Sequence, residues 1–199
     1  LSNPNPDSSP GNVILGLLAR LSLIALHAAL EDGYTYDTAL MGGVVERTSY
    51  NKQGEVVLHK VTLPRPQYSS PKLVECARRV AASPNCGHVI FCEPTAVHVW
   101  LTEVLVEHGI PRERIAILNG KVTKSADRVR IARQFNGLSS DPPPPGTCGG
   151  PSTTAITPKY DVIIANSVAN EGLDLQVRTC SLHHLDLPWT PADLEQRNG

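Results

Sequence analysis

The sequence predicts an α/β fold with a doubly wound parallel sheet, and two observations carry this prediction. Short apolar runs rich in β-branched residues alternate with helical segments from about Ser70 to the end of the chain. Strands that are buried on both faces of a parallel sheet read as continuous apolar runs, and here helices separate such runs. In a sheet of this kind, ligands bind outside the carboxyl ends of the strands.

Composition limits the function classes. The 199 residues are 41% hydrophobic, enough for a core, and the formal net charge is −1. Because the charge is near zero, any nucleic-acid surface must be a local patch. Five cysteines without CxxC spacing argue against a disulfide framework and favour a reducing cytoplasm. No segment has the roughly 20 nearly uncharged residues of a membrane span, so we expect no membrane partner.

The first 66 residues are expected to be a lead-in that extends the sheet domain. A helix is predicted within Val13–Leu30, and we interpret it as amphipathic because apolar residues recur at helical spacing. These positions are Leu17, Leu18, Leu21, Ile24, Ala25 and Ala28. Gly43–Tyr50 and Glu55–Leu63 are strand-like and flank a turn, which predicts a β-hairpin. The hairpin has no evident functional role.

Residues 67–199 are expected to form the sheet domain. Ser70 and Pro71 are a helix cap and a first-turn proline that open a helix to about Ala82. The strands are predicted at His88–Cys92, Arg114–Leu118, Tyr160–Ala165 and Thr179–Leu187. The helices between and after them are predicted at Pro94–Gly109, at Thr123–Gly137 and from the Thr190 cap onward.

A proline-rich segment at 138–158, with "DPPPPGTCGGPSTT", interrupts this alternation. Such a composition cannot form a packed core, so we expect a poorly ordered surface loop. A polyproline II ligand for a partner protein is the alternative interpretation.

Small or polar residues follow every predicted strand. "ANSVANEGLDLQ", after the third strand, can offer backbone N–H groups and short side chains to phosphates or a ribose. The sequence contains neither GxxxxGK[ST] nor GxGxxG after a strand. If a nucleotide binds here, another domain must therefore supply the cradle for its phosphates.

The order of these segments resembles the second RecA-like lobe, the helicase C-terminal domain, of superfamily-2 helicases among the P-loop NTPases. The likeness is narrower to SNF-type DNA translocases. "SPKLVECARRV" resembles the entry helix of the lobe, "HVIFCEP" its motif IV and "DVIIANSVANEGLDL" its motif V. "AILNGKVTKSADRVRIARQFN" resembles the strand, loop and helix between those motifs, and "LHHLDLPWTPADLEQRNG" the approach to motif VI. "GLLARLSLIALHAAL" is similar to the helix that precedes the lobe.

The resemblance covers about Ser70–Gly199 apart from the proline-rich insertion. It is especially close to the helicase parts of bacterial, plasmid or phage proteins that combine a helicase with a DNA methylase. It implies a cytoplasmic, ATP-dependent DNA helicase or translocase whose two lobes clamp ATP and Mg²⁺. The implied partners are DNA and the first RecA-like lobe of the same polypeptide.

The resemblance also implies roles for individual residues. Arg197 would be catalytic. The ATP cleft would be lined by Glu171, Gly172, Asp174 and Gln196. The nucleic-acid backbone would meet Cys92, Glu93, Pro94, Asn119, Gly120, Lys121, Asn166 and Ser167. No resident metal is expected, because His183 and His184 are adjacent on a strand and point to opposite faces.

Two features depart from the family pattern. The family commonly has Thr at the place of Asn166, and Asp or a basic residue at the place of Ser167. Both residues present can still hydrogen-bond a phosphate oxygen. Motif VI of the family runs Gln-Arg-x-Gly-Arg-x-x-Arg, whereas this sequence stops at Gly199. Because the later arginines face the ATP phosphates in the family, we expect this chain alone not to hydrolyse ATP.

Two other function classes remain open. One is a non-catalytic α/β interaction module whose proline-rich loop recruits a partner, and the other is the nucleotide-sugar-binding half of a glycosyltransferase. Lys72, Lys121 and Lys124 could each touch DNA phosphate or simply be solvated. Trp189 is expected to pack under the last helix rather than to stack on a base. Asp186, before a proline turn, is expected to order its loop rather than to act in catalysis.

Overall fold

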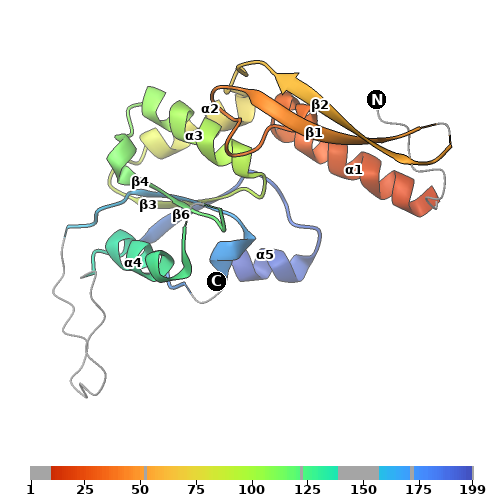
Figure 1. Cartoon of the computed structure of the whole chain (residues 1–199). Coiled ribbons are helices and arrows are strands. Elements are labelled where there is room, and N and C mark those ends of the chain that lie inside the picture. The colour runs from red at the N-terminus through yellow and green to blue at the C-terminus, as the bar shows by residue number, and fades with distance from the viewer. Residues whose placement is uncertain (1–9, 52, 122, 139–156, 171–172, 199) are drawn as a thin grey trace.

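A sheet of four parallel strands lies between two layers of helices (Figure 1). The computed structural model describes residues 10–51, 53–121, 123–138, 157–170 and 173–198. The strand order is β4-β5-β3-β6. The strands are β3 (Gly87–Phe91), β4 (Ile115–Leu118), β5 (Val162–Ala165) and β6 (Thr179–His184). Both β5 and β6 pair in parallel with β3, so the prediction of an α/β fold with a parallel sheet is confirmed.

Helices cover both faces of this sheet. α2 (Pro71–Ala81) and α3 (Thr95–Glu107) lie on one face, and α4 (Ser125–Phe135) and α5 (Pro191–Asn198) on the other (Figure 1). From β3 the chain passes beyond the position of β5 to β4 and then turns back to β5. Since parallel crossovers are right-handed, this reversal puts α3 and α4 on opposite faces.

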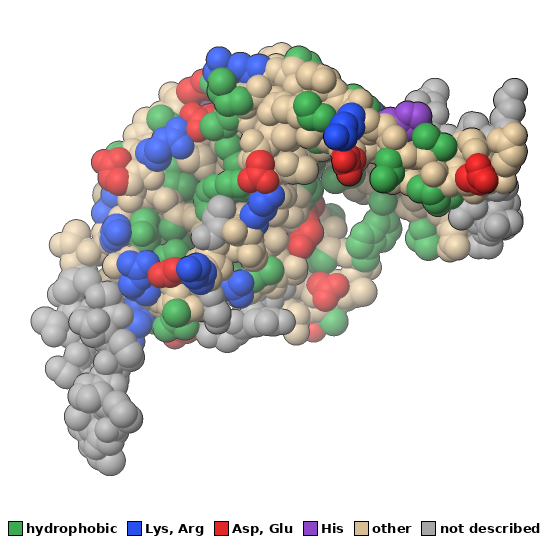
Figure 2. All heavy atoms as spheres, in the orientation of Figure 1, with side chains coloured by type: hydrophobic (Ala, Val, Ile, Leu, Met, Phe, Trp, Pro, Cys, Tyr) green, Lys and Arg blue, Asp and Glu red, His purple; other side chains and the backbone are tan. Residues whose placement is uncertain are grey.

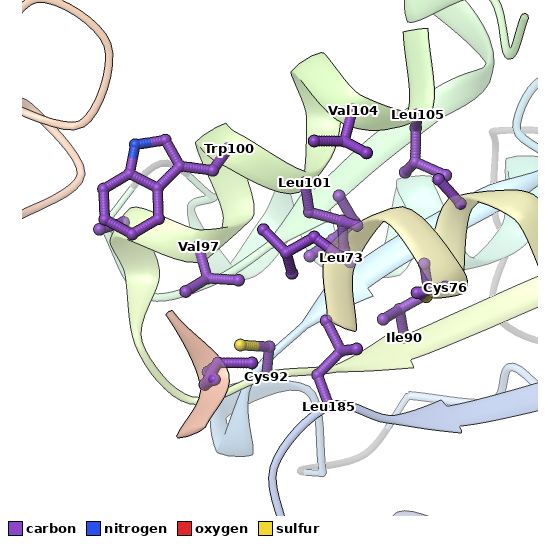
Figure 3. Packing of buried hydrophobic residues seen from close by; sticks show 14 of the residues in the cluster. Leu73, Cys76, Ile90, Cys92, Val97, Trp100, Leu101, Val104, Leu105 and Leu185 are labelled. Atoms are coloured by element: carbon purple, nitrogen blue, oxygen red, sulfur yellow. The ribbon is translucent and has the colours of Figure 1, made fainter. Parts of the chain in front are cut away.

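The larger core lies between the sheet and the layer of α2 and α3. Leu73 and Cys76 of α2 and Leu101 of α3 pack against Ile90 of β3, and all four are buried (Figure 3). The lead-in shares this core. Its contributing residues are Leu26, Leu30, Tyr34, Ala39 and Leu63. The described part of the lead-in therefore packs onto the sheet domain through these residues.

The lead-in consists of α1 (Pro10–Leu26), a 3₁₀ turn (Ala28–Asp32) and an antiparallel hairpin of β1 (Gly43–Tyr50) and β2 (Val56–Leu63). The predicted hairpin is confirmed, with Gly43 opposite Leu63. The Asn51 side chain closes its turn, since Oδ1 accepts hydrogen bonds from the backbone N–H groups of Gln53 at 3.0 Å and Glu55 at 2.8 Å.

The amphipathic interpretation of the first helix implied an apolar face turned to the core, and that is wrong. Leu17 and Leu21 are 51% and 60% exposed, and Leu18 and Ile24 are also exposed. The helix reaches the core through its last turn, where Leu26 is buried, and it ends there rather than at position 30. Within the described ranges, no helix has the length and apolar character that crossing a bilayer requires.

Other boundaries differ in smaller ways. β6 ends at His184 rather than at Leu187, because the chain turns there to bring Asp186 back to the end of β3. Most of the proline-rich segment, positions 139–156, lies outside the described residues, and its expected disorder stays a prediction.

β3 and β6 approach closely at their amino-terminal ends. A Cβ on Gly87 would lie 2.5 Å from the carbonyl oxygen of Arg178 and 2.8 Å from the Phe135 ring. Only glycine fits a backbone approach of this kind. Just beyond this point the pairing register shifts, which marks a bulge in β6.

A largely buried carboxylate joins three strands at this same end of the sheet. Asp161, just before β5, accepts two hydrogen bonds of 2.6 Å from Arg114, just before β4. It accepts another of 2.6 Å from Arg178, just before β6. Burial by itself would raise the pKa of Asp161, but the hydrogen bonds from the two arginines outweigh it and lower that pKa.

We expect Asp161→Asn to lower the free energy of unfolding by about 2 kcal/mol near neutral pH, because two arginines lose their carboxylate. The carboxylate stabilises the fold above its unfolded pKa of about 3.9, and this contribution is lost as the pH falls through the lowered folded pKa. The gap between parent and variant should therefore close below about pH 4. Urea unfolding of both proteins between pH 7 and pH 3 measures it. An equal gap at both pH values would contradict the assignment.

Candidate functional site

The carboxyl ends of the strands bring polar residues from distant parts of the sequence together. Glu93 follows β3, Ser167 follows β5 and Asp186 follows β6. Because the strands are parallel, these ends lie at one edge of the sheet. Arg197 reaches the same place from α5. We call these four residues the strand-end cluster.

Hydrogen bonds connect three of the strand ends within this cluster. The Glu93 carboxylate accepts from the Ser167 hydroxyl at 2.7 Å and from its backbone N–H at 3.1 Å. The backbone N–H of Glu93 in turn donates to Asp186 Oδ2 at 2.6 Å. The loops after β3, β5 and β6 are thus fixed relative to one another.

Arg197 completes the cluster with its positive charge. Its side chain is only 5% exposed. Nη1 donates to Asp186 Oδ1 at 2.9 Å, and Nη2 lies 3.4 Å from Glu93 Oε2. The guanidinium also lies over the Phe91 ring, 5.5 Å from its centroid. Its Nε–H is buried and has no hydrogen-bond partner among the described residues.

A cavity of about 580 Å³ opens beside the strand-end cluster. Figure 2 shows a hollow in the molecule: α1 and the hairpin form an arm on one side of it, and the rest of the domain lies on the other. The cavity is lined by Ala19, Ser22, Leu23, Leu26, Glu93, Pro94, Ser167, Asp186, Leu187, Pro188, Trp189, Asp193 and Arg197. Three carboxylates and one guanidinium leave its polar end negative. The surface is therefore unfavourable for bare phosphate groups.

Hydrogen bonds among buried residues fix the loop after β4. Asn119 is fully buried, and its Nδ2 lies 3.0 Å from His98 Nδ1 of α3. His98 Nε2 donates to the Cys92 carbonyl at 2.7 Å, which leaves Nδ1 as the acceptor for Asn119. Burial lowers the pKa of His98 and so favours this neutral form. Cys92 and the Asn119 amide thus order the site from below rather than line its surface.

The remaining residues predicted to meet nucleic acid lie nearer the surface. Gly120 and Lys121 are exposed, and the ammonium of Lys121 pairs with Asp37. A Cβ on Gly120 would lie 3.5 Å from Val168, which places the loops after β4 and β5 side by side. Asn166 is largely buried, and Pro94 lines the cavity.

The other two lysine candidates differ from each other. The Lys72 ammonium donates to the carbonyl of Leu185 at 2.9 Å, so it supports the turn after β6. Lys124 is exposed at the start of α4.

The residues predicted for an ATP cleft are only partly brought together. Gln196 and Arg197 both line a smaller cavity of about 100 Å³ beside Leu173 and Leu175. Asp174, between those two leucines, is exposed and caps the backbone N–H of Gln176 at 3.0 Å. Glu171 and Gly172 lie outside the described residues.

The sequence also led to expectations for Trp189 and Asp186, which both line the cavity. Trp189 is 68% exposed, so the expectation that it packs under the last helix is wrong. The helix begins at Pro191 and turns its first residues outward, which leaves the indole at the cavity mouth. Asp186 orders its loop as expected, but it also holds Arg197.

The sequence pattern did not single out His98. A histidine in the apolar run "AVHVWL" of a helix was one available signal, because a buried imidazole needs partners for both nitrogens. Among the described residues, no three His, Cys, Asp or Glu side chains are arranged to hold a metal ion.

Comparison with known proteins finds a short similarity. A segment of 38 residues is 53% identical to the "Defense against restriction protein B" of Escherichia phage P1. The match covers 19% of this chain and 2% of the phage protein, so this chain spans a small part of that protein's length. No protein-family model matches the chain.

We expect Arg197→Ala to lower the free energy of unfolding by about 2–3 kcal/mol, because Asp186 keeps a largely buried charge without its partner. Arg130→Ala is the matched control. Arg130 pairs with Asp127 on the exposed surface of α4, so its loss should cost less than about 1 kcal/mol. Urea unfolding of the three proteins at neutral pH compares them, and equal losses would show that the cluster does not stabilise the fold.

Proposed function

We propose that this chain is the second RecA-like lobe of an ATP-dependent DNA helicase or translocase of the SNF type. In this role residues 67–199 form the lobe and residues 1–66 extend it. The observation that carries the proposal is the strand-end cluster. Its members come from three segments that resemble motif IV, motif V and the approach to motif VI, and they are joined by direct hydrogen bonds.

A motor lobe must connect its nucleotide side to its nucleic-acid side, and the strand-end cluster offers such a connection. Arg197 is the residue we assign to catalysis, and it shares its guanidinium between Asp186 and Glu93. Guanidinium groups bind phosphates as readily as carboxylates. If Arg197 turned toward a phosphate, Glu93 would lose a partner and its bonds to Ser167 would change. The loop after β5 would then respond to the state of the nucleotide.

The fold supports the same proposal. A RecA-like lobe requires a parallel sheet with helices on both faces, and this chain has that arrangement. The similarity to a phage protein named for defence against restriction agrees with DNA as the partner, since restriction is cleavage of foreign DNA. That protein comes from a phage, as do some of the helicase–methylase proteins that the sequence resembles.

We place the DNA track on the loops after β4 and β5, outside the cavity. The excess of carboxylates in the cavity repels phosphate, whereas Gly120 and Lys121 are exposed away from it on the loop after β4. Ser167 lines the cavity, and it would offer its hydroxyl to DNA on leaving Glu93. Backbone N–H groups, a hydroxyl and an ammonium are the donors that phosphate contacts use. Asn166 would contribute a neutral hydrogen bond from the base of its loop.

ATP and Mg²⁺ would be bound mainly by the first lobe of the same polypeptide. On this chain, Arg197, Gln196 and Asp174 would face the nucleotide. Arg197 is the cation among them, and it would have to leave Asp186 and Glu93 to meet a phosphate. Their contribution would be to position charge against the phosphates when the lobes close. We place the intact protein in the cytoplasm.

We expect the chain to bind duplex DNA weakly and without sequence preference, with an affinity that falls as salt rises. Lys121→Ala should reduce the slope of log K against log salt by about one unit, because one phosphate loses its counterion-releasing partner. Asn166→Ala should weaken binding with little change in slope, since its contact carries no charge. Fluorescence anisotropy with labelled duplex DNA between low and moderate salt measures both slopes.

Lys60→Ala is the matched control for that experiment. Lys60 is an exposed lysine on β2 of the hairpin, outside the loops of the proposed track, and its removal changes the net charge by the same amount. If the Lys60 and Lys121 variants change the salt dependence of DNA affinity equally, the binding comes from the overall charge of the chain and not from the loops. If neither Lys121→Ala nor Asn166→Ala alters affinity at low salt, the loops do not line a DNA track.

The interaction module is the second candidate, and one observation favours it. The apolar side chains of α1 are exposed over most of its length, including Leu15, Leu17 and Leu21. Exposed apolar surface of this extent is typical of protein–protein contact sites. Absence of DNA binding at low salt would favour this candidate over the motor lobe.

We expect the chain alone to show no ATP hydrolysis with or without DNA, because its sequence contains no GxxxxGK[ST] cradle for the phosphates. Phosphate release is measured with the purified chain and with a mock purification from cells that lack the gene. DNA-stimulated turnover above the mock sample would contradict the expectation. It would also require a nucleotide site that the present assignment lacks.

A further inference from the structure

The amino-terminal ends of β3 and β6 bring two cysteines together. Gly87 pairs with Thr179, and the absence of a side chain on Gly87 lets its backbone approach the carbonyl of Arg178. Cys86 stands immediately before Gly87, and Cys180 stands immediately after Thr179. The two cysteines therefore flank the closest approach of the two backbones, one residue from it on either side.

A bulge in β6 brings the side chains of Cys86 and Cys180 nearer to each other. The register passes from Gly87 opposite Thr179 to His88 opposite Ser181, so Cys180 is the extra residue. The extra residue of a bulge has no pairing partner on the neighbouring strand, which redirects its side chain. The exposed Cys180 thiol donates to the carbonyl of Arg178 at 3.4 Å, and it lies near the partly exposed Cys86 thiol, whose pKa it raises.

The other described cysteines are in a different environment. Cys76 and Cys92 are buried in the core under α2 and α3 (Figure 3). Burial raises the pKa of Cys76 to about 12 and raises that of Cys92 as well, which keeps both thiols protonated and unreactive. Cys148 lies outside the described residues. Cys86 and Cys180 are thus the accessible thiol pair of the described chain.

We propose that Cys86 and Cys180 are a redox-sensitive modification site that forms a reversible disulfide with small disulfide oxidants of the glutathione class. The Cys180 thiolate attacks one sulfur of the oxidant, the sulfur–sulfur bond breaks, and one thiolate leaves. Cys86, deprotonated by the released thiolate, then attacks the Cys180 sulfur and displaces the second thiol. The protein loses two electrons and two protons, and the oxidant gains them.

The disulfide would link the edge strand β6 covalently to the residue before β3. β6 lies at the end of the sheet and pairs only with β3 among the described strands. A disulfide at its start would close a long loop of chain and restrict the unfolded state. It would also fix the strand that leads to Asp186, and hence the support of Arg197. This inference rests on the thiol geometry and does not depend on the proposed motor function.

The test uses the 199-residue chain with Cys148→Ser, so that the described cysteines are the thiols present. Incubation with oxidised glutathione at neutral pH should remove about 2 Da from the intact mass and give one cross-linked peptide pair that contains positions 86 and 180. The melting temperature should rise by roughly 5 °C and return to its starting value when a dithiol reductant is added.

Cys86→Ser and Cys180→Ser in the same background are the matched variants. Each should lose the cross-link and the rise in melting temperature, and the Cys86 variant should instead carry glutathione on Cys180. A parent protein that carries glutathione on Cys180 without the internal bond would overturn the proposal. So would a cross-link to Cys76 or Cys92, or the absence of any reaction.

Discussion

The guanidinium of Arg197 is shared between two carboxylates, and the arrangement of the whole carboxyl edge depends on this sharing. One carboxylate belongs to the turn after β6 and the other to the loop after β3, which in turn holds the loop after β5. A guanidinium suits this task because its planar fork can donate in two directions at once, which an ammonium cannot do with the same geometry. Three loops and the last helix are therefore set by one charged group. The opposite edge uses the reverse arrangement, in which one carboxylate, Asp161, is shared between two arginines.

The two edges also differ in what they leave available. At Asp161 one carboxylate is hydrogen-bonded to both arginines, and the group is structural. At the carboxyl edge the carboxylates outnumber the arginine, a cavity lies alongside, and an exposed tryptophan stands at its mouth. Ligands in parallel α/β sheets bind at this edge, where loops rather than strands supply the side chains. The proposed motor function uses the same asymmetry: one end of the sheet holds the lobe together, and the other end meets its ligands.

The sequence was sufficient for the sheet because each strand is encoded locally. Runs such as "VIF" and "VIIA" are apolar at every position, and burial on both faces favours that pattern. Local pattern could not predict the bond between Glu93 and Arg197, which are 104 positions apart, nor the pairing of Asn119 with His98. It also grouped Glu93 with nucleic acid and Arg197 with ATP, whereas the structure puts them in contact. The outward face of α1 was missed for a related reason, because helical spacing shows which residues share a face but not what lies opposite that face.

The exposed face of α1 has a consequence for the behaviour of the chain in solution. Colloidal stability comes from mutual repulsion between molecules, and a formal net charge of −1 provides almost none. Leucines and isoleucines lie exposed along a helix that touches the core only through its last turn, and their apolar attraction then dominates encounters between copies. Concentration, rather than ionic strength, governs whether such molecules stay apart. The exposed face of α1 thus limits the concentration at which copies of the chain stay separate, although this helix contributes little to the core.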